Sequence, residues 1–377
     1  MALRAKRRRR IRNDFGQGAL ASPNVYRVQA ITTKGAEAMR AVFMTGHGGN
    51  EVIEVGDRPM PQRRPGEVLV RMRAATVNRV DLYMRDSGAG ITHSLPQIMG
   101  VDGAGVIEEA DTPELIGRRV TLYPGIVCGT CEFCRRGEPV LCAKMSLLGE
   151  HRDGTMAEYV CVPADNALPI PDRLDFAQAA ALGVNYLTAW RMLFTKAKLQ
   201  PGETVLVFGV GGGVSLAAMQ IAAAAGARVL ATSRSADKLA RARELGADAV
   251  IDAPADKIPA AVMDLTGGRG ADVVIENIGG AMWSAALKSL VRGGRVATCG
   301  ATIGDQPPAD LRRVFIRQLQ IFGSTLGNPT EFAELIAWCD AGKLTPPIDL
   351  HYPLDDIRTA FDHLESGSQF GKIAIDI

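Results

Sequence analysis

Four cysteines lie within fifteen residues of the chain, with two gaps of two residues and one longer gap. This spacing lets the thiolates converge on one ion at about 2.3 Å in a tetrahedral zinc site. The predicted ligands of one structural Zn2+ are Cys128, Cys131, Cys134 and Cys142. Four protein ligands leave no open position for a substrate, so the chemistry must lie elsewhere. Disulfide pairing is the alternative, but Cys161, Cys299 and Cys339 are scattered and the 377 residues hold only seven cysteines.

A glycine-rich turn follows the apolar run Val205-Leu206-Val207-Phe208 and precedes an alanine-rich segment. Strand, glycine turn and helix in this order let the backbone approach a pyrophosphate and direct helix N–H groups at it. The turn therefore predicts a dinucleotide site. Its predicted cofactor-binding residues are Gly209, Gly211, Gly212, Gly213 and Val214. A tight turn without a ligand is the alternative.

The next predicted strand ends in Thr232-Ser233-Arg234-Ser235, where a site that prefers NAD would place an acid on the ribose hydroxyls. Ser233, Arg234 and Lys238 instead offer a hydroxyl and cations suited to a 2′-phosphate. We therefore expect NADP(H) rather than NAD(H). Alternatively, Lys238 lies on an exposed helix face and makes ordinary ion pairs.

Two patterns divide the chain. Up to about residue 162, short strands broken by glycine and proline predict a compact, mostly β domain. We expect these strands at 41–44, 67–75, 103–109, 119–122 and 159–162. From residue 204, strands alternate with helices, which predicts an α/β fold with a doubly wound parallel sheet. We expect its strands at 204–208, 228–232, 249–251, 272–276, 295–299 and 320–323. The expected helices are at 176–181, 186–193, 214–225, 236–245, 259–266, 282–291, 311–317 and 329–341.

These patterns predict a parallel nucleotide-binding domain at 176–324 and a discontinuous β domain at 39–175 and 325–377, with the cysteine lobe near 124–145. Residues 1–38 hold nine basic and two acidic residues and no apolar period. This arm is predicted to be a disordered extension; an organelle presequence or contact with nucleic acid or anionic membrane are the alternatives. No apolar run is long enough to cross a membrane. We expect a cytoplasmic protein with no nucleic-acid partner apart from contact by this arm.

Several stretches in matching order make the chain from residue 39 onward resemble the medium-chain dehydrogenase/reductase superfamily. They include Asn78-Arg79-Val80-Asp81, Gly100-Val101-Asp102-Gly103, the four-cysteine lobe and Gly371-Lys372-Ile373. The resemblance implies a GroES-like catalytic domain beside a Rossmann domain, a structural zinc in the lobe and a nicotinamide cofactor. It also implies a homodimer, joined through the last strand of the sheet, or a homotetramer.

The chain departs from the zinc alcohol dehydrogenases at the positions of their catalytic zinc ligands. Those enzymes have Cys where this chain has Asn78, His where it has Val101, and Cys near Leu182 or Gly183. Valine, leucine and glycine side chains carry no donor atom, so an open three-ligand zinc site is not expected. The departures resemble the quinone oxidoreductase and enoyl reductase branch.

A hydride delivered to the β-carbon of an enone moves negative charge onto the carbonyl oxygen, which hydrogen-bond donors can stabilise. Our candidates for this role are Asn78, Tyr83, Asn185 and Tyr186. Asn78 could instead cap a helix, and Asp81 could pair with Arg79 or Arg85.

We expect an oxidoreductase that transfers hydride from NADPH to a small-molecule acceptor: an α,β-unsaturated carbonyl, a quinone or an enoyl-CoA-like thioester. One alternative is a zinc-dependent alcohol or aldehyde dehydrogenase with a second zinc site. The other, from a different class, is a cofactor-binding protein whose basic arm binds nucleic acid.

Overall fold

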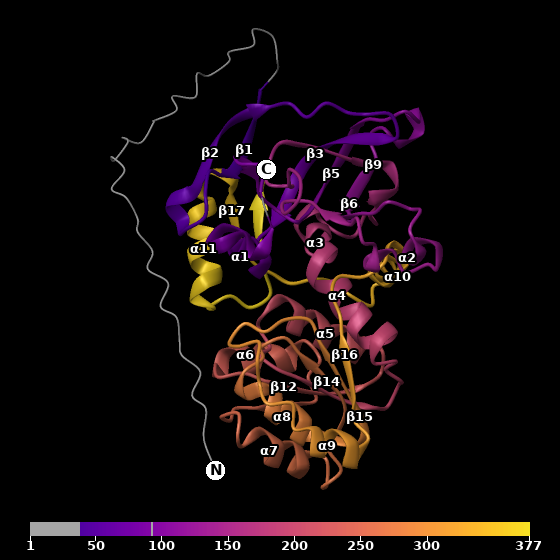
Figure 1. Cartoon of the computed structure of the whole chain (residues 1–377), viewed down its shortest axis with the longest axis vertical. Coiled ribbons are helices and arrows are strands. Elements are labelled where there is room, and N and C mark those ends of the chain that lie inside the picture. The colour runs from indigo at the N-terminus through magenta and orange to yellow at the C-terminus, as the bar shows by residue number, and fades with distance from the viewer. Residues whose placement is uncertain (1–37, 92) are drawn as a thin grey trace, which may run out of the picture. The chain divides into compact units, whose positions relative to one another are not determined.

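A six-stranded parallel sheet forms the second half of the protein in this computed structural model, which describes residues 38–91 and 93–377 (Figure 1). Its strands run in the order β13-β12-β11-β14-β15-β16. The strands are β11 (Thr204–Val207), β12 (Arg228–Thr232), β13 (Ala249–Ile251), β14 (Ala271–Glu276), β15 (Leu290–Thr298) and β16 (Gln320–Gly323). The order reverses between β11 and β14, which is where doubly wound folds bind dinucleotides. The predicted α/β fold class is confirmed.

Helices cover both faces of this sheet, and the alternation of side chains along β11 shows why. Val205 and Val207 pack in one core cluster with α5, whereas Leu206 and Phe208 pack in another with α7 and α8. All four residues of β11 are buried, as expected for a central parallel strand. The helices are α5 (Gly213–Ala224), α6 (Ala236–Glu244), α7 (Ile258–Leu265), α8 (Ala281–Ser289) and α9 (Leu311–Arg317).

The first half of the chain is mostly antiparallel β-structure. A small sheet contains β1 (Ala38–Met44), β2 (Ile53–Pro59) and β4 (Gln97–Ile98). A larger sheet has β3 (Glu67–Thr76) at its centre, paired with β5 (Asp102–Glu109), β9 (Tyr159–Pro163) and β18 (Lys372–Asp376). Its remaining strands are β6 (Arg119–Leu122), β10 (Ala167–Pro169) and β17 (Ile348–Pro353). The last strand of the chain therefore returns to the sheet of the first half, as expected.

The structure adds elements that we did not predict. They include β2, α1 (Arg79–Ser87), β17 and α11 (Ile357–Ser366). The helix predicted at 282–291 ends at Ser289, because Leu290 has extended backbone angles and begins β15. The predicted helix at 186–193 belongs to a longer helical run that includes α3 (Phe176–Ala180), α4 (Leu187–Trp190) and wider π-helical turns at Leu182–Tyr186 and Arg191–Lys196.

Contacts join these sheets into one compact unit that contains every described residue. The predicted domain bounds at 175 and 324 therefore stay predictions. Helix α10 (Pro329–Asp340) packs on α4, with the Trp338 ring edge-on to Trp190 at 4.9 Å between centroids. Among the described residues, no helix has the length and apolar character needed to span a bilayer. Residues 1–37 of the predicted basic arm lie outside the described residues.

Candidate active site and metal centre

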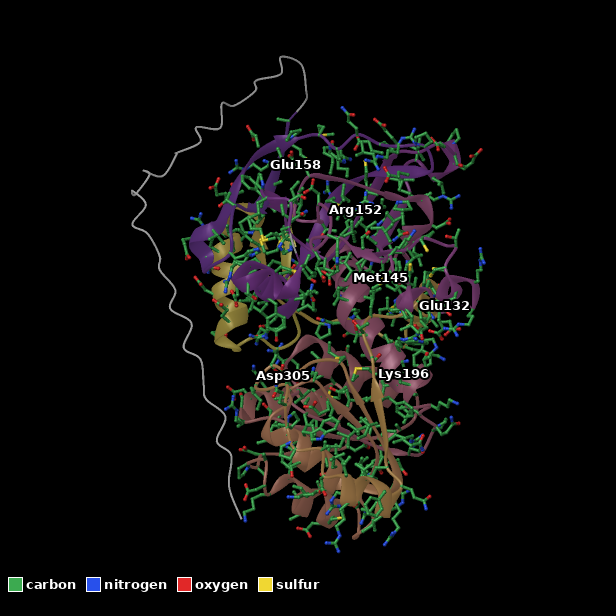
Figure 2. All side chains as sticks on the ribbon, viewed as in Figure 1. Glu132, Met145, Arg152, Glu158, Lys196 and Asp305 are labelled. Carbon is green, nitrogen blue, oxygen red and sulfur yellow. The ribbon has the colours of Figure 1, made fainter. Side chains whose placement is uncertain are left out.

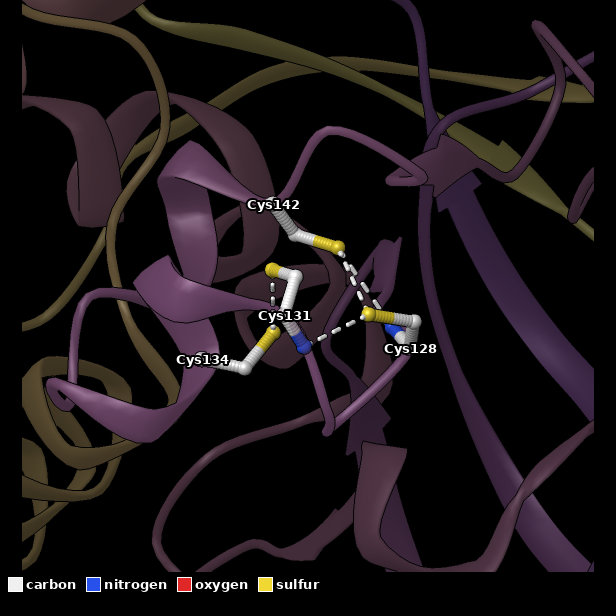
Figure 3. A group of neighbouring side chains, drawn as sticks. All are labelled: Cys128, Cys131, Cys134 and Cys142. Atoms are coloured by element: carbon white, nitrogen blue, oxygen red, sulfur yellow. Dashed lines mark hydrogen bonds between the residues drawn. The ribbon is translucent and has the colours of Figure 1, made fainter.

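The four lobe cysteines converge on one point (Figure 3). Their sulfur atoms all lie within 4.8 Å of one another, and the sulfurs of Cys131 and Cys134, and of Cys128 and Cys142, are 3.5 Å apart. Cys134 lies in the short helix α2 (Glu132–Arg135) and Cys131 directly precedes it, whereas Cys128 and Cys142 lie in the flanking loops. In Figure 2 the lobe can be located from Glu132 and Met145. In the described part of the chain, no other group of three or more Cys, His, Asp or Glu has such a geometry.

The electrostatics of the lobe suit a bound dication. Backbone N–H groups of Thr130 and Cys131 lower the pKa of Cys128 to about 6, whereas burial raises the pKa of Cys134 to about 12. Four crowded thiols cannot all ionise without a compensating charge, and Zn2+ supplies it. The cluster could therefore hold one zinc with a complete protein ligand set, which stabilises a loop but does no chemistry.

A buried ion network holds the lobe against the helices beside it. Arg191, which is 1% exposed, donates to both carboxylate oxygens of Glu331 at 3.0 Å and to Glu138 of the lobe at 2.6 Å. Asn328, which precedes α10, accepts from the backbone N–H of Val140 at 3.2 Å. Arg191 and Asn328, which both lie outside the lobe, thus attach it to the neighbouring helices.

The glycine turn between β11 and α5 has the conformation that a pyrophosphate cradle requires. Gly209 and Gly211 have positive φ angles of 66° and 122°, which L-residues rarely adopt. A Cβ atom at Gly213 would fall 2.0 Å from the amide oxygen of Asn185, and one at Gly211 would fall 2.8 Å from Cδ of Lys238. Helix α5 begins directly after this turn, so its free N–H groups are available to an anion.

The residues predicted to recognise the adenosine end lie at the carboxyl end of β12. Arg234 is exposed and Ser233 is half-buried, with its hydroxyl accepting from the N–H of Ser235 at 3.2 Å. Lys238 lies against Gly211 and donates to the carbonyl of Gly367 at 2.5 Å, and burial lowers its pKa. The structure therefore brings Lys238, but not Arg234, against the glycine turn.

A cavity of about 460 Å3 lies between the glycine turn and the end of β3. Of the predicted site residues, Gly209, Gly212, Gly213, Val214, Asn78, Tyr83 and Asn185 line it. Tyr186 does not: it is 1% exposed and its hydroxyl donates to Gln220 of α5. Its predicted contact with substrate is therefore not supported, because the helical turn points its ring away from the cavity. Asn185 lies against Gly213, which places it at the cofactor turn rather than at the reacting end.

A second, larger hollow of about 610 Å3 lies at the amino ends of the parallel strands. Its walls carry four arginines, of which Arg269 and Arg295 pair with Asp272 and Glu203. None of the predicted site residues lines it. The 460 Å3 cavity is therefore the candidate active site.

Lys372 lies at the wall of the candidate active site, directly across from Asn78. The antiparallel register of β18 on β3 pairs Ala374 with Thr76, and its continuation by two residues places Lys372 opposite Asn78. The Lys372 ammonium donates to Asn78 Oδ1 at 2.6 Å and to the Val77 carbonyl at 3.2 Å, and lies 3.5 Å from Asp102 Oδ2. Three acceptors thus surround Nζ, which matches the three N–H donors of the charged form. Burial lowers the pKa of Lys372, and the neighbouring Asp102 and Asp81 oppose that shift.

The carboxylates around Lys372 are held by backbone and hydroxyl donors. Asp102 accepts from the Thr76 hydroxyl at 2.6 Å, and Asp81 accepts from the Asn78 N–H at 2.7 Å. Burial, and then Asp102, raise the pKa of Asp81 to about 8. Asp81 thus accepts from the backbone at the N-terminus of α1 and does not pair with Arg79 or Arg85. Asn78 directly precedes that helix, as expected if Asn78 caps a helix.

Sequence reasoning proposed no role for two charged residues that line the cavity, Lys372 and Glu150. Lys372 appeared only within the stretch Gly371-Lys372-Ile373, where nothing local indicates that it faces Asn78. Glu150 follows the lobe, is 7% exposed and lines the cavity. Burial raises its pKa to about 7. No sequence signal marks it, because its burial depends on contacts with distant segments.

The six-stranded parallel sheet with its glycine turn, together with the antiparallel β-structure and its cysteine lobe, has the architecture of a zinc-type dehydrogenase. Two family models match the chain: "Alcohol dehydrogenase GroES-like domain" over residues 64–172 and "Zinc-binding dehydrogenase" over residues 213–341. An alcohol dehydrogenase of Geobacillus stearothermophilus is 32% identical over 330 residues, which cover 86% of this chain and 96% of that protein. The chain belongs to the zinc-type medium-chain dehydrogenase/reductase superfamily.

Solved structures of several activities share the fold. An NAD-dependent alcohol dehydrogenase is 41% identical, with a TM-score of 0.86 over 90% of this chain and 100% of its own. A crotonyl-CoA carboxylase/reductase is 25% identical, with a TM-score of 0.83 over 90% of this chain and 88% of its own. With the family matches, these neighbours show that the protein is an NAD(P)-dependent oxidoreductase of this superfamily. The neighbours themselves include alcohol dehydrogenases and a reductase.

Proposed function

We propose that the protein is an NADPH-dependent reductase of α,β-unsaturated carbonyls, quinones or enoyl thioesters, and that it works without a catalytic metal. The observation that carries this proposal is the position of the Lys372 ammonium, 2.6 Å from Asn78 Oδ1 and 3.5 Å from Asp102 Oδ2. Any metal bound here would need the oxygens of Asn78 and Asp102 as ligands, and the Lys372 ammonium already lies against both.

The donor set argues in the same direction. Of the three positions that hold zinc ligands in the resembling alcohol dehydrogenases, only Asn78 offers a donor atom, and its oxygen is taken by Lys372. Val101 lines the cavity with an apolar side chain, and a Cβ at Gly183 would already fall 3.0 Å from the Leu122 carbonyl. A dication here would find one weak ligand and a neighbouring positive charge, which opposes binding.

The side chains present can support reduction of a polarised double bond. NADPH, when bound, supplies the hydride. The Tyr83 hydroxyl has no hydrogen-bond partner among the described residues, and burial raises the pKa of Tyr83, so it keeps its proton at neutral pH. It can donate to the carbonyl oxygen as negative charge develops there. Asn78, fixed by Lys372 and by its own donation to the Thr76 carbonyl at 3.2 Å, has a second N–H for the same oxygen.

The preference for NADPH over NADH rests on Ser233, Arg234 and Lys238, with no acid at the end of β12. Arg234→Ala should lower kcat/KM for NADPH by about 10- to 100-fold and leave that for NADH unchanged, because the lost contact is to the 2′-phosphate. Arg241→Ala, which changes an exposed arginine of the following helix α6 that pairs with Asp349, is the matched control. Equal losses with both cofactors would contradict the assignment.

Metal content and substrate range test the proposal together. We expect one zinc per chain by elemental analysis, and oxidation of NADPH with enones, quinones or acryloyl thioesters. The alternative, a zinc-dependent alcohol or aldehyde dehydrogenase, is favoured by the names of the relatives at 32% and 41% identity. Two zinc ions per chain with oxidation of alcohols would establish that alternative instead.

We also propose a homodimer joined through β16, at the edge of the parallel sheet. Ile321 of this strand and Phe315 of the preceding helix are 42% and 68% exposed, and large apolar side chains so exposed indicate an interface. Sedimentation analysis of the wild type and of Ile321→Lys tests this assembly. A dimer that the substitution leaves intact would exclude β16 as the contact.

A further inference from the structure

Glu150 differs from every other buried charged side chain in the described chain. Each of the others has a hydrogen bond or an ion pair, for example Glu276 with two backbone N–H groups and Asp272 with Arg269. The carboxyl group of Glu150 has neither, although it is only 7% exposed. An unpaired buried carboxyl destabilises a fold, so its presence at the wall of a cavity indicates a role toward a ligand.

The backbone around Glu150 is held in one position. Gly149 has a φ of 72°, and a Cβ there would fall 2.5 Å from the Gly100 carbonyl. The Glu150 N–H donates to the Leu147 carbonyl at 3.3 Å, and His151 Nδ1 accepts from the Leu147 N–H at 3.2 Å. The tight turn is therefore packed against the segment that carries Val101, and it directs Glu150 into the same cavity as Asn78 and Tyr83.

We propose that Glu150, in its protonated form, is the catalytic residue that donates a proton to the α-carbon of the substrate. This inference rests on the proposed function, reduction of an activated double bond. It assigns separate tasks to two side chains of one cavity: Tyr83 donates a hydrogen bond to the carbonyl oxygen, and Glu150 delivers the proton to carbon.

The reaction balances without a further reactant. The β-carbon of the substrate accepts the hydride, the π electrons of the double bond move toward the carbonyl, and an enolate forms. When those electrons return, the α-carbon takes the proton from the Glu150 carboxyl group. The saturated carbonyl compound leaves, NADP+ is the oxidised product, and the Glu150 carboxylate regains a proton from water.

The surroundings of Glu150 keep a proton available near neutral pH. Burial raises its pKa to about 7, where a general acid is most effective. Glu150 also contributes, after burial and Asp102, to the raised pKa of Asp81, so the two carboxyl groups are neighbours. Lys372 and Arg79 bring positive charge to the cavity wall, Tyr83 and Cys299 also line the cavity, and His151 follows Glu150 in the chain.

The test compares Glu150→Gln with Glu334→Gln, an exposed position on α10. With an enone and saturating NADPH, Glu150→Gln should lower kcat by about 100-fold or more, as expected when a general acid is lost. The decline of wild-type kcat above about pH 7 should be absent from the variant. The Kd for NADPH, from cofactor fluorescence, should stay within twofold of wild type, and Glu150→Asp should recover part of the rate.

Two readouts separate this role from a structural one. Reduction of a quinone protonates oxygen rather than carbon, so Glu150→Gln should retain most of its quinone activity. In D2O, the wild type should place deuterium on one face of the α-carbon, and the variant should give both configurations, as measured by NMR. A wild type that reduces no enone, quinone or thioester refutes the proposed function itself. An active wild type and a Glu150→Gln variant with unchanged enone rate, pH profile and stereochemistry would overturn the role of Glu150 alone.

Discussion

The cysteine lobe and the floor of the cavity gather polar side chains around a centre in two different ways. In the lobe, four sulfurs lie within 4.8 Å of one another and no side-chain cation is among them. On the cavity floor, oxygens of Val77, Asn78 and Asp102 surround the ammonium of Lys372. The lobe could therefore hold an external cation, whereas the cavity supplies a cation from its own lysine.

On this comparison, the cysteine lobe contributes to the stability of the fold, whereas the residues around Lys372 contribute to the chemistry. A closed ligand set can hold a loop in place but cannot bind substrate. The cavity floor binds no metal on this interpretation, and its lysine instead fixes the orientation of Asn78 for hydrogen bonding. The comparison predicts that metal removal should affect folding, and that changes around Lys372 should affect both folding and turnover.

Loss of a lobe ligand should have the largest effect. Cys131→Ser should abolish zinc binding and lower the free energy of unfolding by about 5 kcal/mol, because the folded state loses the metal that compensates four crowded sulfurs. Zinc content and urea unfolding are the measurements. Cys161→Ala, a buried cysteine of β9 outside the cluster, should retain its zinc, and a zinc-free Cys131→Ser of unchanged stability would contradict the structural role.

Removal of the cation from the cavity floor should have the second largest effect. Lys372→Met leaves Asp102 buried without its counter-charge, which should cost about 3–5 kcal/mol of folding free energy. The zinc content should stay at one per chain. The double variant Lys372→Met/Asp102→Asn should recover much of the loss, because both charges are then gone. If Lys372→Met alone gains a second zinc, the lysine is what excludes a metal from the cavity.

The local patterns of the sequence were sufficient for the parallel sheet, the glycine turn and the cysteine lobe. They also contained a signal that we did not use: Ile357, Ala360, Phe361 and Leu364 have helical spacing, and Gly367 follows as a left-handed cap. Lys372 and Glu150 could not be found in this way. Their positions depend on the register of β18 on β3 and on the packing of Gly149 against Gly100, which are contacts between distant segments.

The pH dependence of stability tests whether Glu150 is as poorly solvated as the structure indicates. Its pKa in the folded protein is about 7, above the ordinary 4.5, so the folded state holds this proton more tightly than the unfolded chain. The stability from Glu150 is complete below pH 4.5 and is lost as the pH rises through 7. Relative to Glu150→Gln, the wild type should lose up to about 3 kcal/mol over this range in urea unfolding. If the free energy of unfolding of the wild type and of Glu150→Gln changed equally with pH, the burial of an unpaired carboxyl would be contradicted.

The smallest effect concerns how the lobe is held once zinc is bound. Glu138→Gln removes the ion pair to Arg191 but leaves Arg191 paired with Glu331, so no buried charge is stranded. Because Glu138 is 37% exposed, the loss should be about 1 kcal/mol or less. Zinc release to a chelator should nevertheless become faster, since the lobe opens more often when one of its attachments is weakened. Glu132→Gln, on α2 of the same lobe and without an ion pair in the described chain, is the control, and equal release rates in the two variants would locate the attachment elsewhere.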